Sequence, residues 1–474
     1  MKKLLATILA LVMALGVTTI SWASEVENVA QTTKGNTTTQ YSSLAEALNA
    51  AKDGGTVELL KNVTLTGNWT TVGTESEPFK GTFDGKGYTI TGLNIPTNDN
   101  EYVGLIGILH GGTVKNVKFA SVSVTGKNDV GTAVGRIING GTVSGVQVLG
   151  GTVSGAKRVG GVVGSIKANG TVSDCTNAAG VTANDRNAGG IVGSAYYTET
   201  GKQMYITGCV NNGAVTASGV CGGIVSLSAA NVSGNTNTAA VKGTEVGGIV
   251  GEQKSYGSVT NNTNSGSVTN NTNSGAVTNT GGNAAYGAGG IIGWLRYHET
   301  SEANAYPVSE IISVTGNKNS GSVTGKNDAG GIVGVVYNSA VIMNNKNTAT
   351  SISAATFAAG IVGNYQTVET PAAEAPAQNK LTFGDDNTST ATLEQITAQC
   401  KDRLIYTNGN AIEIVEVPDP TPEQPPHYYY HPTTDTKTDT TKGSPKTFDA
   451  GVGIYAVTAV LSVTGMAWTA KKRH

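Results

Sequence analysis

The sequence is poor in charged and aromatic side chains. Of its 474 residues, 14% are Asp, Glu, Lys or Arg and 6% are Phe, Trp or Tyr, whereas 65 are glycine. The formal net charge of −2 provides no basic surplus to neutralise phosphates, which argues against a nucleic-acid partner. Four cysteines without a Cys-x-x-Cys spacing do not indicate zinc, and no cofactor is predicted. The abundant glycine is instead typical of short strands joined by tight turns.

The N-terminus has the features of an export signal. Lys2 and Lys3 precede an apolar stretch from Leu4 to Ile20, and small residues follow it up to Ala23. We therefore predict a signal peptide over residues 1–23. A retained membrane anchor is the alternative, although the apolar stretch is short for one.

A charge-free segment lies close to the C-terminus. Residues 450–470 are long enough to cross a bilayer as a helix, and the basic residues after them are expected to stay in the cytoplasm. The Pro/Thr-rich residues 418–443 cannot bury a core and are predicted to form an extended spacer. His427 and His431 lack a third ligand, so no metal site is predicted.

The order of spacer, pentapeptide, apolar segment and basic tip resembles the sorting signal of sortase-anchored surface proteins of Gram-positive bacteria. In that family sortase cuts the motif Leu-Pro-x-Thr-Gly after the Thr and joins it to the cell wall. Here the Pro and the Thr match, whereas Ser replaces the Leu and Phe replaces the Gly. The resemblance implies a sortase-like partner and a location outside the cell, anchored in the wall or, without cleavage, in the membrane. The predicted signal covers 444–474, and its motif residues are Ser444, Pro445, Lys446, Thr447 and Phe448.

A glycine-rich hexapeptide recurs through the centre of the chain. AGGIVG stands at 188–193 and 329–334, with close copies at 159–164, 246–251 and 288–293. The spacing is about 29 residues where it is most regular, and it stretches to 42 further on, which indicates inserted loops. Repeats of this length point to a solenoid.

The residues of the repeat favour strands over helices. Val, Ile, Thr, Asn and Gly dominate, and the apolar positions alternate. We predict an all-β fold, a right-handed parallel β-helix of about 29-residue coils over residues 36–366 including an N-terminal cap. Strands are expected at segments such as GIVG, TVSDC and GVTA. Glycine is expected at corners where a Cβ would strike the next coil, about 4.8 Å away.

One position of the repeat carries an asparagine in coil after coil. Stacked amides can form a hydrogen-bonded ladder along the axis, so a structural role is favoured over a ligand site. Two positions earlier, Cys175 and Cys209 fall on adjacent coils, as a disulfide or as stacked thiols. The expected ladder residues are Asn177, Asn211, Asn237, Asn264, Asn273, Asn319 and Asn347.

Both ends of the solenoid need covers. Residues 41–66 predict a short helix capped by Ser42 or Ser43, followed by a glycine pair and a strand, which resembles the N-terminal cap of pectate-lyase-like β-helices. Residues 79–95, together with the repeats, resemble the GLUG-repeat surface proteins of gut and mucosal bacteria. Residues 378–417 lose the repeat and are predicted to form a C-terminal cap with a short helix at 392–401.

Many β-helices cleave polysaccharides with clustered charged residues. This chain offers Asp84, Asp129, Asp185 and Asp328, of which the last three precede a repeat glycine and are expected to bond their own backbone in turns. Asp185 beside Arg186 is the best catalytic fragment, but no catalytic residue is assigned.

Two insertions, at 194–205 and 294–307, hold a large share of the aromatic residues. Aromatic rings bury sugar faces and peptides well, so we predict an adhesin-like protein that binds carbohydrate or host surface polymers there. Rings that merely cover a coil interface are the alternative at the level of the site. A polysaccharide lyase or glycoside hydrolase, or a structural stalk, are the alternatives at the level of function. The candidate ligand-binding residues are Tyr196, Tyr197, Trp294, Tyr297 and Tyr306.

Overall fold

The structure is a computed structural model of the chain. Contacts divide the chain into two units, Met1–Val417 and Pro418–His474, and every described residue belongs to the first. The predicted signal peptide, spacer and sorting signal therefore lie outside the described residues. Among the described residues, no helix has the length and apolar character needed to cross a membrane. The structure describes residues 27–96, 99–197, 203–254, 259–260, 262–264, 268–270, 287–296, 312–337, 340–366, 381–394, 400–401, 404–407 and 412–415.

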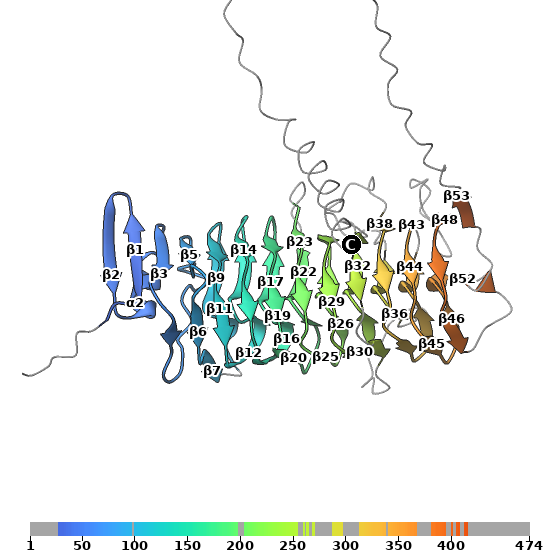
Figure 1. Cartoon of the computed structure of the whole chain (residues 1–474), viewed down its shortest axis with the longest axis horizontal. Coiled ribbons are helices and arrows are strands. Elements are labelled where there is room, and N and C mark those ends of the chain that lie inside the picture. Colours follow the sequence, from blue (N-terminus) through green and yellow to red (C-terminus); the bar gives the residue numbers. More distant parts are fainter. Residues whose placement is uncertain are drawn as a thin grey trace, which may run out of the picture. The chain divides into compact units, whose positions relative to one another are not determined.

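The described chain winds into coils that stack strand upon strand (Figure 1). Each coil contributes in turn to sheet A, sheet B, sheet D and sheet C. Sheet A contains, in spatial order, β2 (Thr37–Tyr41), β1 (Ala30–Lys34), β3 (Thr56–Leu59), β5 (Thr82–Asp84), β10 (Thr113–Lys115), β14 (Thr142–Ser144), β18 (Thr171–Ser173), β23 (Tyr205–Thr207), β28 (Asn231–Ser233), β33 (Val259–Thr260), β38 (Ile312–Thr315), β43 (Ala340–Met343), β48 (Leu381–Gly384) and β53 (Ile412–Val415).

Sheets B and C follow the same order of coils. Sheet B contains β4 (Val63–Thr64), β6 (Thr89–Thr91), β11 (Lys118–Ala120), β15 (Gln147–Val148), β19 (Thr176–Asn177), β24 (Val210–Asn211), β29 (Thr236–Asn237), β34 (Thr263–Asn264), β39 (Lys318–Asn319), β44 (Lys346–Asn347) and β49 (Thr388–Ser389). Sheet C contains β9 (Ile106–His110), β13 (Val134–Ile138), β17 (Val163–Lys167), β22 (Val192–Tyr197), β27 (Val225–Ser228), β32 (Val250–Lys254), β37 (Ile292–Arg296), β42 (Val333–Tyr337), β47 (Val362–Gln366), β52 (Ile405–Thr407) and β51 (Cys400–Lys401).

Sheet D has two columns of strands, which the long strands β12 and β16 join. The first column contains β7 (Asn94–Pro96), β12 (Val122–Val130), β16 (Gly151–Gly160), β20 (Gly180–Ala183), β25 (Val215–Ala217), β30 (Val241–Gly243), β35 (Val268–Asn270), β40 (Val323–Gly325), β45 (Ser351–Ala354) and β50 (Thr392–Glu394). The second column adds β8 (Glu101–Val103), β21 (Ala188–Gly189), β26 (Val220–Gly222), β31 (Glu245–Gly247), β36 (Gly287–Gly289), β41 (Asp328–Gly330) and β46 (Phe357–Ala359).

The predicted parallel β-helix is confirmed. Val134 pairs with Val163 and Val163 with Val192, which is the expected spacing of 29 residues in parallel register. The pairing of Val250 with Ile292 accommodates the longest predicted spacing. Sequence reasoning missed the very short strands of sheet B, which hold two or three residues each. Inward Val, Ile and Leu side chains from all four sheets form one continuous buried core.

The N-terminal end is covered as predicted. Helix α2 (Leu44–Ala50) begins after Ser43, whose hydroxyl accepts a hydrogen bond from the Glu46 amide at 3.4 Å. The helix buries Leu44, Ala47 and Leu48 against the first coil. An antiparallel hairpin of β1 and β2 precedes it, so the described fold begins ahead of the predicted start at residue 36.

The predicted C-terminal cap is wrong in part, because its residues continue the coils. Strands β48, β49 and β50 pair in parallel with β43, β44 and β45. Strand β50 also occupies the start of the helix predicted at 392–401. Continued stacking satisfies the backbone groups of the preceding coil, which a helix in this place would leave without partners.

The corner glycines are explained by close packing of neighbouring coils. A Cβ on Gly190, the second glycine of AGGIVG, would overlap the carbonyl oxygen of Gly223 and the side chain of Asn211. Gly290 and Gly331 meet the equivalent carbonyl and asparagine of their own neighbours. The glycine corner and the asparagine position of the repeat therefore need each other.

The predicted asparagine ladder is present. The Nδ2 of Asn177 donates to the Oδ1 of Asn211 at 3.0 Å, and that of Asn211 donates to Asn237 at 2.8 Å. Asn319 continues the ladder to Asn347 at 2.9 Å. Asn264 pairs directly with Asn319 in sheet B, so Asn273, which lies outside the described residues, is not a step between them.

A second ladder lies two positions earlier in each coil and was not predicted. Each Nδ2 donates to the Oδ1 of the next coil at 3.0–3.1 Å, and each Oδ1 also accepts a backbone amide. Its side chains are fully or almost fully buried. The second ladder consists of Asn235, Asn262, Asn317, Asn345 and Asn387.

The same position holds cysteine in two earlier coils. Cys175 and Cys209 lie on adjacent coils, as expected, and both are buried free thiols. The Sγ of Cys175 donates to the Ser173 carbonyl at 3.1 Å. A hydrogen bond with Cys175, together with burial, holds the pKa of Cys209 well above its usual range. The alternative of stacked thiols is the one that the structure contains.

Candidate functional site

The aromatic residues of the two insertions start from the same edge of sheet C. Tyr196 near the end of β22 is 39% exposed, and Trp294 in β37 is half-buried. Two strands, β27 and β32, separate β22 from β37, so the insertions lie three coils apart as predicted, about 15 Å along the axis. Of the other candidates, Tyr297 and Tyr306 lie outside the described residues, as does the side chain of Tyr197.

A chain of charged groups connects the two rings. The Nζ of Lys254 lies over the Tyr196 ring at 4.1 Å, and the Arg296 guanidinium lies over the Trp294 ring at 4.4 Å. Glu252 binds both cations, at 3.7 Å and 2.6 Å respectively. The structure therefore brings Tyr196 and Trp294 into one network, although neither ring touches the other's strand.

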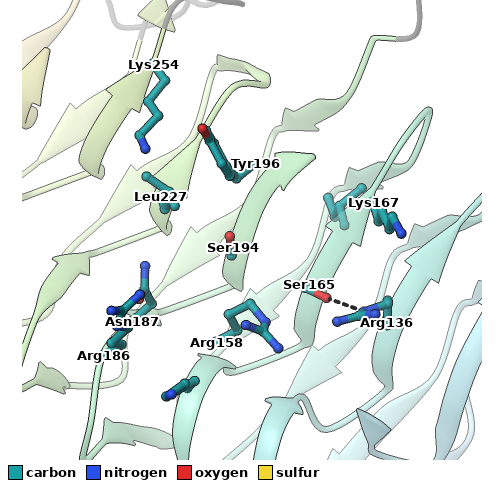
Figure 2. A pocket seen from close by; sticks show the side chains of 12 residues that line it. Arg136, Arg158, Ser165, Lys167, Arg186, Asn187, Ser194, Tyr196, Leu227 and Lys254 are labelled. Carbon is teal, nitrogen blue, oxygen red and sulfur yellow. Dashed lines mark hydrogen bonds between the residues drawn. The ribbon is translucent and has the colours of Figure 1, made fainter. Parts of the chain in front are cut away.

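A groove of about 560 Å³ runs along this face of the molecule beside Tyr196 (Figure 2). Ser165 and Ser194 lie at its centre, and positively charged side chains from different strands surround them. Its lining contains six cations and no carboxylate. The cations of this basic groove are Arg136, Lys157, Arg158, Lys167, Arg186 and Lys254.

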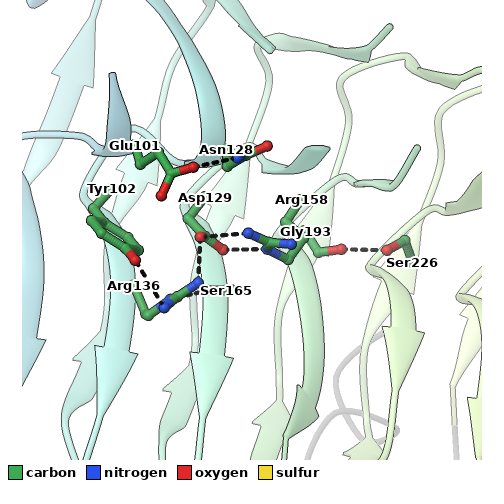
Figure 3. Close-up of polar contacts among 9 residues, drawn as sticks. All are labelled: Glu101, Tyr102, Asn128, Asp129, Arg136, Arg158, Ser165, Gly193 and Ser226. Carbon is green, nitrogen blue, oxygen red and sulfur yellow. Dashed lines mark hydrogen bonds and ion pairs between the residues drawn. The ribbon is translucent and has the colours of Figure 1, made fainter. Parts of the chain in front are cut away.

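A buried carboxylate fixes two of these cations (Figure 3). Asp129 is fully buried and binds the Arg158 Nε and the Arg136 guanidinium, each at 2.6 Å. Arg136 also donates to the Tyr102 hydroxyl and to Ser165, each at 3.3 Å. The bond to Asp129 raises the pKa of Arg158. Asp129 is thus an ion-pair centre rather than the predicted turn residue, because two arginines of neighbouring strands converge on it.

The basic groove keeps a surplus of positive charge. Three carboxylates bind its cations: Asp129 holds two arginines, Asp185 pairs with Lys157 at 3.2 Å, and Glu252 pairs with Lys254. Six cations against three carboxylates leave three positive charges, in a chain whose formal net charge is −2. Sequence reasoning missed this groove because it considered charge only as a total.

The candidate catalytic acids do not converge. Asp185 is a half-exposed ion-pair partner of Lys157, and Arg186 lines the basic groove. Asp84 lies in sheet A, where it accepts a hydrogen bond from the Lys86 amide. Asp328 lies buried in β41, where Asn364 donates to it at 2.9 Å and burial raises its pKa to about 6. The predicted role as a turn residue is therefore wrong for Asp328 too, since its partner is a side chain of β47.

A further acid, Glu245, is buried close to the network around Glu252. Burial, and next the negative charge of Glu252, raise the pKa of Glu245 to about 8, against the opposing charges of Arg296 and Lys254. The Oε2 atom of Glu245 is buried, and no described residue bonds it. Folding therefore keeps this carboxyl protonated at pH values where the unfolded chain would release the proton.

Replacing Glu245 by Gln should change how stability depends on pH. Because the folded pKa exceeds the unfolded one, the contribution of Glu245 is complete below about pH 4.5 and is lost as the pH rises through 8. We expect Glu245→Gln to melt close to the wild type at low pH and several degrees above it in alkaline solution. Thermal melts across this range measure the effect. The exposed Glu46→Gln should differ from the wild type by a constant amount, and a constant offset for Glu245→Gln would contradict the prediction.

The fold and the site define a parallel β-helix protein with a basic groove on sheet C. No protein-family model matches the chain. A 60-residue stretch is 45% identical to halomucin from Haloquadratum walsbyi, and it covers 12% of this chain and 1% of halomucin. A Bacteroides ovatus protein of known crystal structure, provisionally assigned as an immunoglobulin A1 protease, is 16% identical with a TM-score of 0.29, over 77% of this chain and 78% of that chain. The assignment of the fold rests on the strand pairing described above.

Proposed function

We propose that this protein is displayed on the cell surface, where it binds carbohydrate polymers along the outer face of sheet C. The observation that carries the proposal is the groove of about 560 Å³ beside Tyr196. Hydroxyl and amide groups of Ser165, Ser194 and Asn187 line it together with one aromatic ring and the cations. Such a mixture of polar groups and an aromatic face is typical of sugar-binding surfaces.

The length of the groove supports a polymer over a small molecule. Its lining residues come from β13, β17, β22, β27 and β32, which are five neighbouring strands of sheet C. Five strands span about 19 Å along the axis. An extended chain lying along the coils would contact all of them.

The display part of the proposal depends on the two ends of the chain. The apolar segment behind Ala23 and the motif around Pro445 and Thr447 support export and anchoring by a sortase-like transpeptidase. Anchoring at the C-terminal end would leave the coils and their groove outside the cell.

Binding should depend on the two described aromatic residues. We expect the variant Tyr196→Ala/Trp294→Ala to lose about tenfold in affinity for the glycans that the wild type binds, because each ring contributes contact area and stacking. Titration of the full-length protein on an array of glycans, mucins and plant polysaccharides measures this.

Tyr205→Ala provides the matched control, because Tyr205 is similarly exposed, at 41%, but belongs to sheet A. Equal binding by the wild type and both variants would move the contact surface away from Tyr196. Absence of binding across the array would favour a structural stalk, and scission of a polysaccharide would favour a lyase or hydrolase.

A further inference from the structure

We propose that the basic groove is a seat for a linear acidic polysaccharide, whose carboxylate or sulfate groups it binds. This inference rests on the proposed function and names the chemical class of its ligand. Its basis is the side-chain arrangement around Ser165 and Ser194, where six cations meet and no carboxylate faces the groove.

The six cations divide into a fixed group and an exposed group. Asp129 holds Arg136 and Arg158 in place, and Glu252 holds Lys254. Fixed cations lose little conformational freedom when a ligand binds, so they form a preorganised wall of the groove. They retain a net positive charge because two arginines share one carboxylate.

Lys157, Lys167 and Arg186 form the exposed group. Lys157 pairs with the half-exposed Asp185, and Lys167 and Arg186 are exposed side chains on consecutive coils. Among the described residues, no side chain forms an ion pair with the Arg186 guanidinium, which is suited to bidentate binding of carboxylate or sulfate. These three side chains are therefore expected to contact the acidic groups directly.

The neighbouring groove has the opposite charge. It measures about 600 Å³, and its lining contains Glu75, Asp99 and Glu101 but no lysine or arginine. The Asp129 network lies between the two, since its Tyr102 also lines this acidic groove. A polyanion would be attracted to the coils from β13 onwards and repelled from those before it.

An acidic glycan fits the basic groove better than a nucleic acid. Single-stranded nucleic acids are usually bound by several aromatic side chains on which successive bases stack. The lining of the basic groove offers Tyr196 as its one aromatic ring, and its remaining polar groups are hydroxyls and an amide that suit sugar hydroxyls.

The test compares dextran with dextran sulfate, which share a backbone and differ in charge. Full-length wild-type protein should bind dextran sulfate at least about tenfold more tightly, with an affinity that falls as salt rises. The variant Lys157→Gln/Lys167→Gln/Arg186→Gln removes the three surplus charges and should lose about tenfold in affinity for dextran sulfate, with a weaker salt dependence. Its circular dichroism should match that of the wild type, since all three residues lie at the surface.

A second triple variant controls for net charge. Lys242→Gln/Lys318→Gln/Lys346→Gln removes three exposed lysines from sheets D and B. It should keep wild-type affinity within about twofold, since these lysines lie on other sheets than the groove. Equal losses in both triple variants would overturn the assignment to the groove, and tighter binding of single-stranded DNA than of dextran sulfate would overturn the assignment to a glycan.

The outcomes separate this inference from the proposed function. Binding of neutral glycans that depends on Tyr196 and Trp294, without preference for the sulfated polymer, would refute the inference alone. Binding of dextran sulfate that depends on the three cations but not on the two rings would support the inference and refute the role of the rings. Binding of no polymer of either kind would refute both.

Discussion

Replacement of Gly190 by Ala is expected to lower the free energy of unfolding by at least about 3 kcal/mol. The added Cβ would overlap the Gly223 carbonyl oxygen, which belongs to the next coil, and the buried side chain of Asn211. Neither group can move freely: Gly223 belongs to the next corner, and Asn211 bonds both the Gly213 carbonyl and the following asparagine. The cost is steric, since both neighbours are held by paired backbone.

Gly180→Ala is the matched control within the same coil. A Cβ at this position meets no atom within 4 Å, and its backbone requires no positive φ. We expect this variant to be neutral or slightly stabilising, because alanine restricts the unfolded chain. Urea unfolding of the two variants tests the pair, and a Gly190→Ala variant as stable as Gly180→Ala would refute the close-packing explanation of the repeat.

Replacement of Asn317 by Ala should cost about 2–4 kcal/mol, which is the second largest effect. Its Oδ1 accepts the amide of Asn262 at 3.1 Å, and its Nδ2 donates to the Val259 carbonyl at 2.9 Å and to Asn345 at 3.0 Å. Alanine would leave the buried Asn262 amide without an acceptor. Because each coil contacts only its neighbours, the loss would weaken one interface and broaden or split the unfolding transition.

Asn212→Ala controls for the loss of an amide side chain. Asn212 is exposed and accepts a single hydrogen bond, from the Thr238 hydroxyl. Its replacement should change the free energy of unfolding by no more than about 0.5 kcal/mol and leave the transition sharp. If Asn317→Ala unfolded like Asn212→Ala, the second ladder would contribute nothing to the cohesion of the coils.

The fold was predictable because a solenoid converts local repetition into long-range pairing. Once the spacing of 29 residues is known, Val134, Val163 and Val192 must stack, and Asn177 and Asn211 follow. The last coil escaped prediction because it lacks the hexapeptide. Its signal was the pair Asn387 and Ser389, which takes the ladder positions of Asn345 and Asn347.

The basic groove was harder to predict because its residues do not repeat. Arg136, Arg158 and Arg186 stand at three different positions of the coil, and a net charge close to zero conceals their convergence. The register nevertheless carried a usable signal. Asp129 and Arg158 are 29 residues apart, so the coil spacing alone places an acid beside a base on neighbouring strands. The regular stacking of the repeat could have been applied to its irregular residues.

The two asparagine ladders have a direction. Every amide donates to the coil that follows and accepts from the coil that precedes it, and backbone amides bound to the Oδ1 atoms fix this orientation. Each coil therefore presents the same donor on one side and the same acceptor on the other. A gene segment that encodes one coil could be duplicated or deleted without reversing any of these bonds. The length of the solenoid, and with it the distance of the groove from an anchored end, is thus free to vary between descendants of this sequence.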